Sequence, residues 1–155
     1  MTIHSVYRPF LRVFRHARMF WLYELFHING ATSVLDVGGS GEFWRVATEL
    51  GFPMPRMAIQ KVLPPMDAKG TFAWAVADGA KILFCANSFD VAVSNSFIEH
   101  VGGFAMRLSF GEEVKRVAPN AFVQAPDYWC MVEPHVLALF STFASAKIAS
   151  PGIAV

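Results

Sequence analysis

The chain has 155 residues, with 13 basic and 12 acidic side chains that leave a formal net charge of +1. This length allows one domain with a substantial core, and the near-neutral charge gives no global argument for a nucleic-acid partner. Hydrophobic residues make up 54% of the chain, yet no uncharged apolar run approaches the roughly 20 residues that a membrane-spanning helix needs.

The first 29 residues are predicted to form a basic amphipathic helix that begins after Ser5 or Tyr7 and closes at Asn29-Gly30. Its arginines at 8, 12 and 15 share one face, and another face carries Phe10, Phe14, Ala17, Trp21 and Leu25. Such a helix can lie on an anionic membrane surface. We favour a helix packed on the domain with a solvated arginine face. Because arginines interrupt the segment where a signal peptide needs its apolar region, we expect a cytoplasmic protein.

A short apolar segment, Thr32–Val37, is predicted to be a parallel strand buried on both faces. It leads through Asp36 into a glycine turn, Gly38–Gly41, where glycine permits a positive φ and lets a ligand approach the backbone. Residues 42–50 then have the apolar spacing of a helix, and Gly51 stands just past its end. A helix in that place presents free N–H groups and the positive end of its dipole. The stretch therefore predicts a site for a polar cofactor.

The rest of the chain continues the alternation of strands and helices. Further strands are predicted at Met57–Val62, Thr71–Val76, Phe89–Ser94 and Ala121–Gln124. A helix is predicted at about 104–117, although Gly111 lies inside it. This alternation favours a parallel α/β sheet with right-handed crossovers. Cys85 and Cys130 are too few and too far apart to propose a disulfide framework or a metal site.

A series of motifs beyond the glycine turn sharpens this interpretation. In chain order they are Asp78-Gly79, Asn87–Ser96, Ile98–Val101, Arg116–Pro119, Phe122–Pro126 and Glu133–His135. Over roughly residues 30–140 the chain resembles class I S-adenosylmethionine-dependent methyltransferases, most closely the small-molecule methyltransferase domain group and a bacterial subgroup of it. The resemblance implies a Rossmann-like, mostly parallel sheet of about five strands with flanking helices. It also implies S-adenosyl-L-methionine as the cofactor.

The resemblance assigns roles to individual residues of this chain. The turn made by Asp36, Gly38, Gly39, Ser40 and Gly41 would face the methionine part of the cofactor, with Asp36 acting through the loop amides or a water. Asp78 and Gly79 would lie beside the adenine, with the Asp78 carboxylate accepting from the exocyclic amine. Asn95 and Ser96 would border the methionine and the mouth for the acceptor. Ligands of open α/β sheets bind outside the carboxyl ends of the strands, which agrees with this placement.

Two features depart from the family's pattern. The glycine turn is one residue shorter than the common form of the motif, and the bacterial subgroup tolerates such a turn. The second predicted strand ends in Gln60-Lys61, where the family usually has an acid that holds both ribose hydroxyls. Gln60 could offer one hydrogen bond, worth about 1 kcal/mol. Weak cofactor affinity is therefore one expectation from this sequence.

Methyl transfer needs a general base only when the acceptor is a hydroxyl or a protonated amine. His100 is the catalytic candidate, with His135, Glu99 and Glu133 as alternatives. Each also has a purely structural interpretation: Glu99 and His100 can open or cap the helix after the fourth strand, and Glu133 and His135 can order a loop around Pro134. Tyr128 and Trp129 could wall an acceptor pocket or belong to the core. No metal ligand set is predicted.

The chain also ends earlier than the family's usual final two-strand hairpin, so we expect a shortened fold. We divide it into an N-terminal helix (1–29), a methyltransferase-like domain (30–135) and an apolar C-terminal segment (136–155). The fifth strand would then be a sheet edge, which is an aggregation liability unless it is covered. We expect residues 136–148 to pack over that edge or to make a homodimer contact.

Three functions remain open from the sequence. The first is a methyltransferase acting on a small molecule or on a lipid- or sugar-linked acceptor. The second is a degenerate methyltransferase-like binding or scaffold domain without catalysis. The third is a fragment of a nicotinamide-cofactor oxidoreductase, which needs the same missing acid or an arginine that reads a phosphate.

Overall fold

The computed structural model describes residues 3–63, 72–78, 80–125 and 153–154. Within these residues the elements follow the order α1 (Ile3–Phe26), β1 (Ser33–Val37), α2 (Gly41–Glu49), β2 (Arg56–Lys61), β3 (Ala73–Val76), β4 (Val91–Asn95), η1 (Ile98–His100), α3 (Phe104–Val117), β5 (Asn120–Gln124) and β6 (Ile153–Ala154). The bounds of α2, α3 and the first five strands lie within two residues of those predicted. Gly111 does not interrupt α3.

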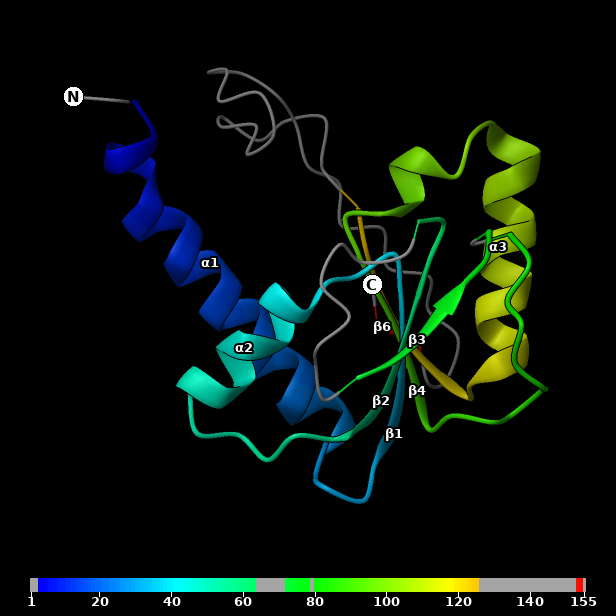
Figure 1. Ribbon diagram of the computed structural model, residues 1–155, viewed down its shortest axis with the longest axis horizontal. Coiled ribbons are helices and arrows are strands. Elements are labelled where there is room, and N and C mark those ends of the chain that lie inside the picture. Colours follow the sequence, from blue (N-terminus) through cyan, green and yellow to red (C-terminus); the bar gives the residue numbers. More distant parts are fainter. Residues whose placement is uncertain (1–2, 64–71, 79, 126–152, 155) are drawn as a thin grey trace.

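The strands form one parallel sheet in the order β3-β2-β1-β4-β5-β6 (Figure 1). The predicted α/β fold with about five parallel strands is confirmed. The expectation that β5 forms the edge is wrong, because its residues Ala121 and Phe122 pair with the two residues of β6. The predicted cover at 136–148 lies outside the described residues. The strand order reverses between β1 and β4, so the turn after β1 stands at the point where ligands of such sheets bind.

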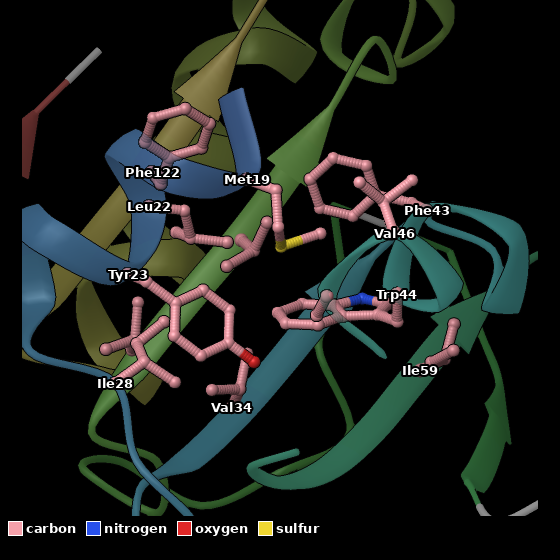
Figure 2. Close-up of a cluster of buried hydrophobic side chains, with 13 residues drawn as sticks. Met19, Leu22, Tyr23, Ile28, Val34, Phe43, Trp44, Val46, Ile59 and Phe122 are labelled. Carbon is pink, nitrogen blue, oxygen red and sulfur yellow. The ribbon is translucent and has the colours of Figure 1, made fainter. Parts of the chain in front are cut away.

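Helices cover both faces of the sheet (Figure 1). α1 and α2 lie on one face, where Met19 and Leu22 of α1 share a buried cluster with Trp44 of α2 (Figure 2). α3 lies on the other face, where Phe110 and Val114 pack with small and branched side chains of the strands. The alternation of side chains along β1 divides its residues between the two clusters.

The face of α1 that packs on the sheet is not the predicted one. Met19, Leu22 and Tyr23 are buried, whereas Phe14, Trp21 and Leu25 are 62%, 66% and 51% exposed. Packing of this helix on the domain is as expected, and Arg12 and Arg15 of the predicted arginine face are exposed. The Arg12 guanidinium pairs with Glu49 of α2 at 3.7 Å, and the Arg18 side chain reaches the sheet. In the described part of the chain no helix has the length and apolar content to cross a membrane.

Candidate functional site

The turn after β1 is closed by tight backbone packing. Gly38 has a φ of +81° and donates its N–H to the backbone oxygen of Gln60 at 2.8 Å. A Cβ at Gly38 would overlap the Phe97 ring, and a Cβ at Gly39 would overlap the Asp36 carboxylate. The neighbours of these two positions therefore already require glycine, before any ligand is considered.

The Asp36 carboxylate lies beneath this turn and is wholly buried. Its Oδ2 accepts a hydrogen bond from the indole Nε1–H of Trp44 at 2.8 Å, and its Oδ1 has no partner among the described residues. Burial raises the pKa of Asp36 to about 7, against the opposing effects of the Trp44 hydrogen bond and the Lys61 charge. Because Gly39 covers it, Asp36 can act on a ligand only through the backbone of the turn.

The turn opens directly into α2. Its N-cap, Ser40, is extended and makes no side-chain capping hydrogen bond. The first N–H groups of a helix have no intrahelical partner, and the helix dipole favours an anion at that end. A ring edge of Phe72 lies beside Gly41, 3.1 Å from the place of a Cβ. The turn and the start of α2 together are suited to a carboxylate or phosphate oxygen.

Gln60 has a different role from the predicted ribose contact. Its side chain, only 1% exposed, donates from Nε2 to the backbone oxygens of Asp78 and Lys81, at 3.1 and 3.5 Å. Its Oε1 accepts from the backbone N–H of Leu83 at 3.2 Å. Both amide hydrogens are used and the amide is enclosed, so Gln60 ties the loop that follows β3 to the end of β2.

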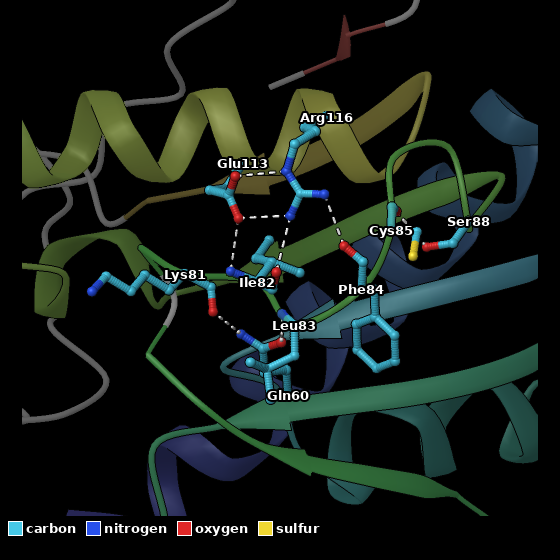
Figure 3. A network of polar contacts seen from close by, with 9 residues as sticks. All are labelled: Gln60, Lys81, Ile82, Leu83, Phe84, Cys85, Ser88, Glu113 and Arg116. Atoms are coloured by element: carbon cyan, nitrogen blue, oxygen red, sulfur yellow. Dashed lines mark hydrogen bonds and ion pairs between the residues drawn. The ribbon is translucent and has the colours of Figure 1, made fainter.

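A second tie holds the same loop to α3 (Figure 3). Arg116 donates to both oxygens of Glu113 at 2.7 and 2.8 Å and to the backbone oxygens of Ile82 and Phe84 at 2.9 and 2.8 Å. Glu113 in turn accepts from the Ile82 N–H at 2.8 Å. Accepting these hydrogen bonds lowers the pKa of Glu113. The network fixes the loop between 80 and 85 to α3.

These ties put Asp78 at the same edge of the sheet as the glycine turn. Its backbone is bonded to Gln60, and Gln60 pairs with Val37 at the end of β1. The Asp78 side chain is exposed, and its Oδ1 accepts from the N–H of Ala80 at 3.0 Å. Its Oδ2 has no hydrogen bond among the described residues. Gly79 lies outside them.

β4 ends at Asn95, and Ser96 follows it, on the other side of the turn. Ser96 has a φ of +54°, an uncommon conformation outside glycine, and donates its N–H to the Gln124 backbone oxygen at 2.9 Å. The Asn95 side chain accepts a hydrogen bond from Arg18 at 2.8 Å, and Gln124 accepts from the same nitrogen at 2.9 Å. Sequence analysis missed Arg18. Its spacing of three from Arg15 gave no sign that it points toward the strands.

His100 ends the short helix η1 and has a side chain that is 65% exposed. Its Nε2 lies 3.9 Å from Glu99 Oε1, and both Glu99 carboxylate oxygens are buried without a hydrogen bond among the described residues. No hydrogen bond within those residues joins His100 to the turn or to Asn95. Its catalytic role stays a prediction. Tyr128, Trp129, Glu133 and His135 lie outside the described residues.

Comparison with known proteins identifies solved structures with a similar fold. No protein-family model matches the sequence, and no curated protein matches it as a relative. A SAM-dependent methyltransferase from Aquifex aeolicus is similar at a TM-score of 0.54 and 21% identity, over 74% of this chain and 65% of that one. A SAM-dependent methyltransferase from Archaeoglobus fulgidus gives 0.56 and 20%, over 75% and 53%. The [4+2]-cyclase SpnF gives 0.59 and 17%, over 81% and 51%.

The chain spans 51% to 65% of the length of these three solved proteins. At such low identity the likeness shows the fold alone. The fold is that of class I SAM-dependent methyltransferases, in agreement with the motifs in the sequence. SpnF is named for a cyclisation, so activity has to be argued from the residues of the site.

Proposed function

We propose that this chain, with its class I methyltransferase fold, binds S-adenosyl-L-methionine and transfers a methyl group to a small-molecule acceptor or to a lipid- or sugar-linked one. The observation that carries the proposal is the uncapped start of α2, which follows a glycine turn at the point where the strand order reverses. The cofactor has a carboxylate at one end and an adenine at the other, and the site offers a polar group for each.

In this proposal the backbone of Gly39, Ser40 and Gly41 holds the methionine carboxylate. Asp36 holds the turn in shape from below, through Trp44. Asp78, whose Oδ2 has no hydrogen bond among the described residues, accepts from the adenine amine. The cofactor supplies an activated methyl group, so the main task of the chain is to align the acceptor with it.

His100 stays the candidate general base for a hydroxyl or protonated amine acceptor. If it acts so, His100→Asn should lower kcat by about 100-fold or more while leaving cofactor affinity unchanged. An unchanged kcat would assign His100 a structural role in η1. The expected cytoplasmic location also stays a proposal, based on the arginines near the N-terminus.

Calorimetric titration with S-adenosylmethionine, S-adenosylhomocysteine and NAD tests the cofactor. Binding of the first two alone supports the proposal, and Asp78→Asn should then weaken both, while Asp90→Asn, at the opposite end of β4, should not. Methyl incorporation into acceptor extracts would show activity. Binding of NAD alone would instead support the oxidoreductase alternative.

A binding or scaffold domain without catalysis is the second candidate. It is favoured by the enclosed Gln60, which leaves no side chain on β2 with a carboxylate for ribose, and by the packing of Phe97 and Asp36 against the glycines. Absence of calorimetric heat with all three cofactors at millimolar concentration would select it.

A further inference from the structure

Three side chains meet at the ends of β4 and β5. Asn95 and Gln124 are the last residues of these strands and are register partners. Arg18 of α1 bridges them through a single nitrogen, Nη1, at 2.8 and 2.9 Å. Its Nε also donates to the Phe14 backbone oxygen at 3.3 Å. The bridge joins positions 77 and 106 residues apart in the sequence.

These hydrogen bonds use the amide oxygens as acceptors and leave the amide nitrogens as donors. Arg18 occupies an oxygen of each amide, so the amide nitrogens of Asn95 and Gln124 remain. Neither of them, nor Nη2 of Arg18, donates a hydrogen bond to any described residue. None of the three is a buried orphan atom of the described residues, and all three side chains are partly exposed. Each of these nitrogens carries two hydrogens.

The positive charge in this cluster has no counter-ion among the described residues. Arg18 forms none of their ion pairs, whereas Arg12 and Arg116 both have a carboxylate. Burial, and then the nearby charge of Arg15, lower the pKa of the Arg18 guanidinium. A half-buried cation surrounded by donors is stabilised by an anion with several acceptor oxygens.

We propose that Arg18, Asn95 and Gln124 form a subsite for an anionic group, a carboxylate or a phosphate, on the molecule that is methylated. The inference rests on the proposed function, because that function puts the cofactor over β1, β2 and β3. The cluster lies across the β1–β4 boundary from there, on the side left for the acceptor. The start of α2 is available for the cofactor's own carboxylate, so the two anions have separate places.

Benzoate and phenyl phosphate are suitable probes, with benzamide as the neutral control. The Nε–H resonance of Arg18, identified by its loss in Arg18→Lys, should shift and saturate with the two anions and stay unmoved by benzamide. Because hydrogen bonds to a charged donor are about twice as strong as neutral ones, Arg18→Gln should weaken probe binding at least about tenfold. Arg15→Gln, at an exposed arginine whose charge is felt by Arg18, is the matched control and should weaken probe binding far less.

Gln124→Glu is the second variant, for the case that loss of Arg18 unfolds the chain. Its carboxylate gives Arg18 an internal counter-ion, so the protein should remain folded by thermal unfolding and lose probe binding. An unshifted Nε–H resonance in the wild type, or equal probe affinity in Gln124→Glu, overturns the subsite. A preference for phenyl phosphate over benzoate would assign the group as a phosphate, and the reverse preference as a carboxylate.

Two further titrations separate this proposal from others. If Arg18→Gln weakens S-adenosylhomocysteine but not 5′-methylthioadenosine, which lacks the carboxylate, Arg18 reads the cofactor and the acceptor subsite is overturned. If the probes bind at Arg18 while no cofactor binds, the anion site stands and the proposed methyltransferase function fails. If the cofactor binds and the probes do not, the proposed cofactor binding stands and the anion subsite is overturned.

Discussion

Two regions of the molecule use polar side chains in opposite ways. Around the loop that follows β3, the side chains of Gln60, Glu113 and Arg116 bond to the loop backbone and to each other, and nearly all of their donors and acceptors have a partner. On the side of β1, β4 and β5, Asp36 keeps an orphan oxygen and Arg18 keeps an unpaired charge among the described residues. Buried polar groups cost stability unless they are satisfied.

This difference separates structure from function without reference to any relative. The satisfied network fixes a loop, and its members need no ligand to explain them. Asp36 and Arg18 lie at the end of the sheet where the strand order reverses, which is where ligands bind. Three substitutions test the division, and the first has the largest expected effect.

Asp36→Asn should change how stability depends on pH. Burial raises the pKa of Asp36 from its ordinary value of 3.8 to about 7 in the folded state, so the folded state disfavours the ionised carboxylate. Its contribution is fully present below pH 3.8 and is lost as pH rises through 7. Between pH 4 and pH 8 the unfolding free energy of the wild type should therefore fall by on the order of 4 kcal/mol because of this group. Asp36→Asn should not show this fall. Urea unfolding at both pH values measures this.

Asp90→Asn is the matched control for that experiment. Ser33 donates to the Asp90 carboxylate from its hydroxyl and its backbone N–H, which lowers the pKa of Asp90. Its contribution is present above the unfolded pKa and is lost as pH falls, so the sign is opposite. Parallel pH profiles for the wild type and Asp36→Asn would show that the Asp36 carboxylate is satisfied.

Gln60→Glu tests whether the satisfied side also serves the cofactor. A glutamate there would point a carboxylate at the backbone oxygens of Asp78 and Lys81, at a cost of about 3 kcal/mol. We expect lower stability and no gain in affinity for S-adenosylhomocysteine by calorimetry. Lys61→Glu, at the half-buried next position, is the control and should cost less. A tenfold gain in affinity for Gln60→Glu would restore the ribose contact that the sequence suggested.

Arg116→Met removes the other tie of the loop. It leaves the oxygens of Ile82 and Phe84 without their donor, and Glu113 with the Ile82 N–H alone. We expect a lower urea midpoint, with a smaller loss than for Gln60→Glu because the pair is partly exposed. Lys115→Met, one residue earlier and exposed, should have little effect. If Arg116→Met unfolds at the same urea concentration as the wild type, the network does not stabilise the loop.

The elements were predictable because a parallel strand buried on both faces is a short apolar run between turns. Helix α3 begins and ends as predicted. Contacts between distant segments were not predictable. The sequence around Gln60 does not show that residues 78–83 return over it, and nothing near Arg18 indicates the ends of β4 and β5. The turn at the candidate site was predictable because Asp36, the glycines and the start of α2 are neighbours in the sequence.

The periodicity of helix α1 also did not show which of its faces packs on the sheet. A substitution on its exposed face has the smallest expected effect of those proposed. Phe14, Trp21 and Leu25 have helical spacing, but so do Met19, Leu22 and Phe26, and only the second set faces the sheet. Trp21→Ser should therefore change the unfolding free energy by less than about 0.5 kcal/mol, whereas Leu22→Ala, the matched buried change, should cost about 3 kcal/mol. Urea unfolding at two protein concentrations checks both. A large loss for Trp21→Ser at the higher concentration alone would mean that a second copy covers this face, because a contact between chains strengthens with concentration.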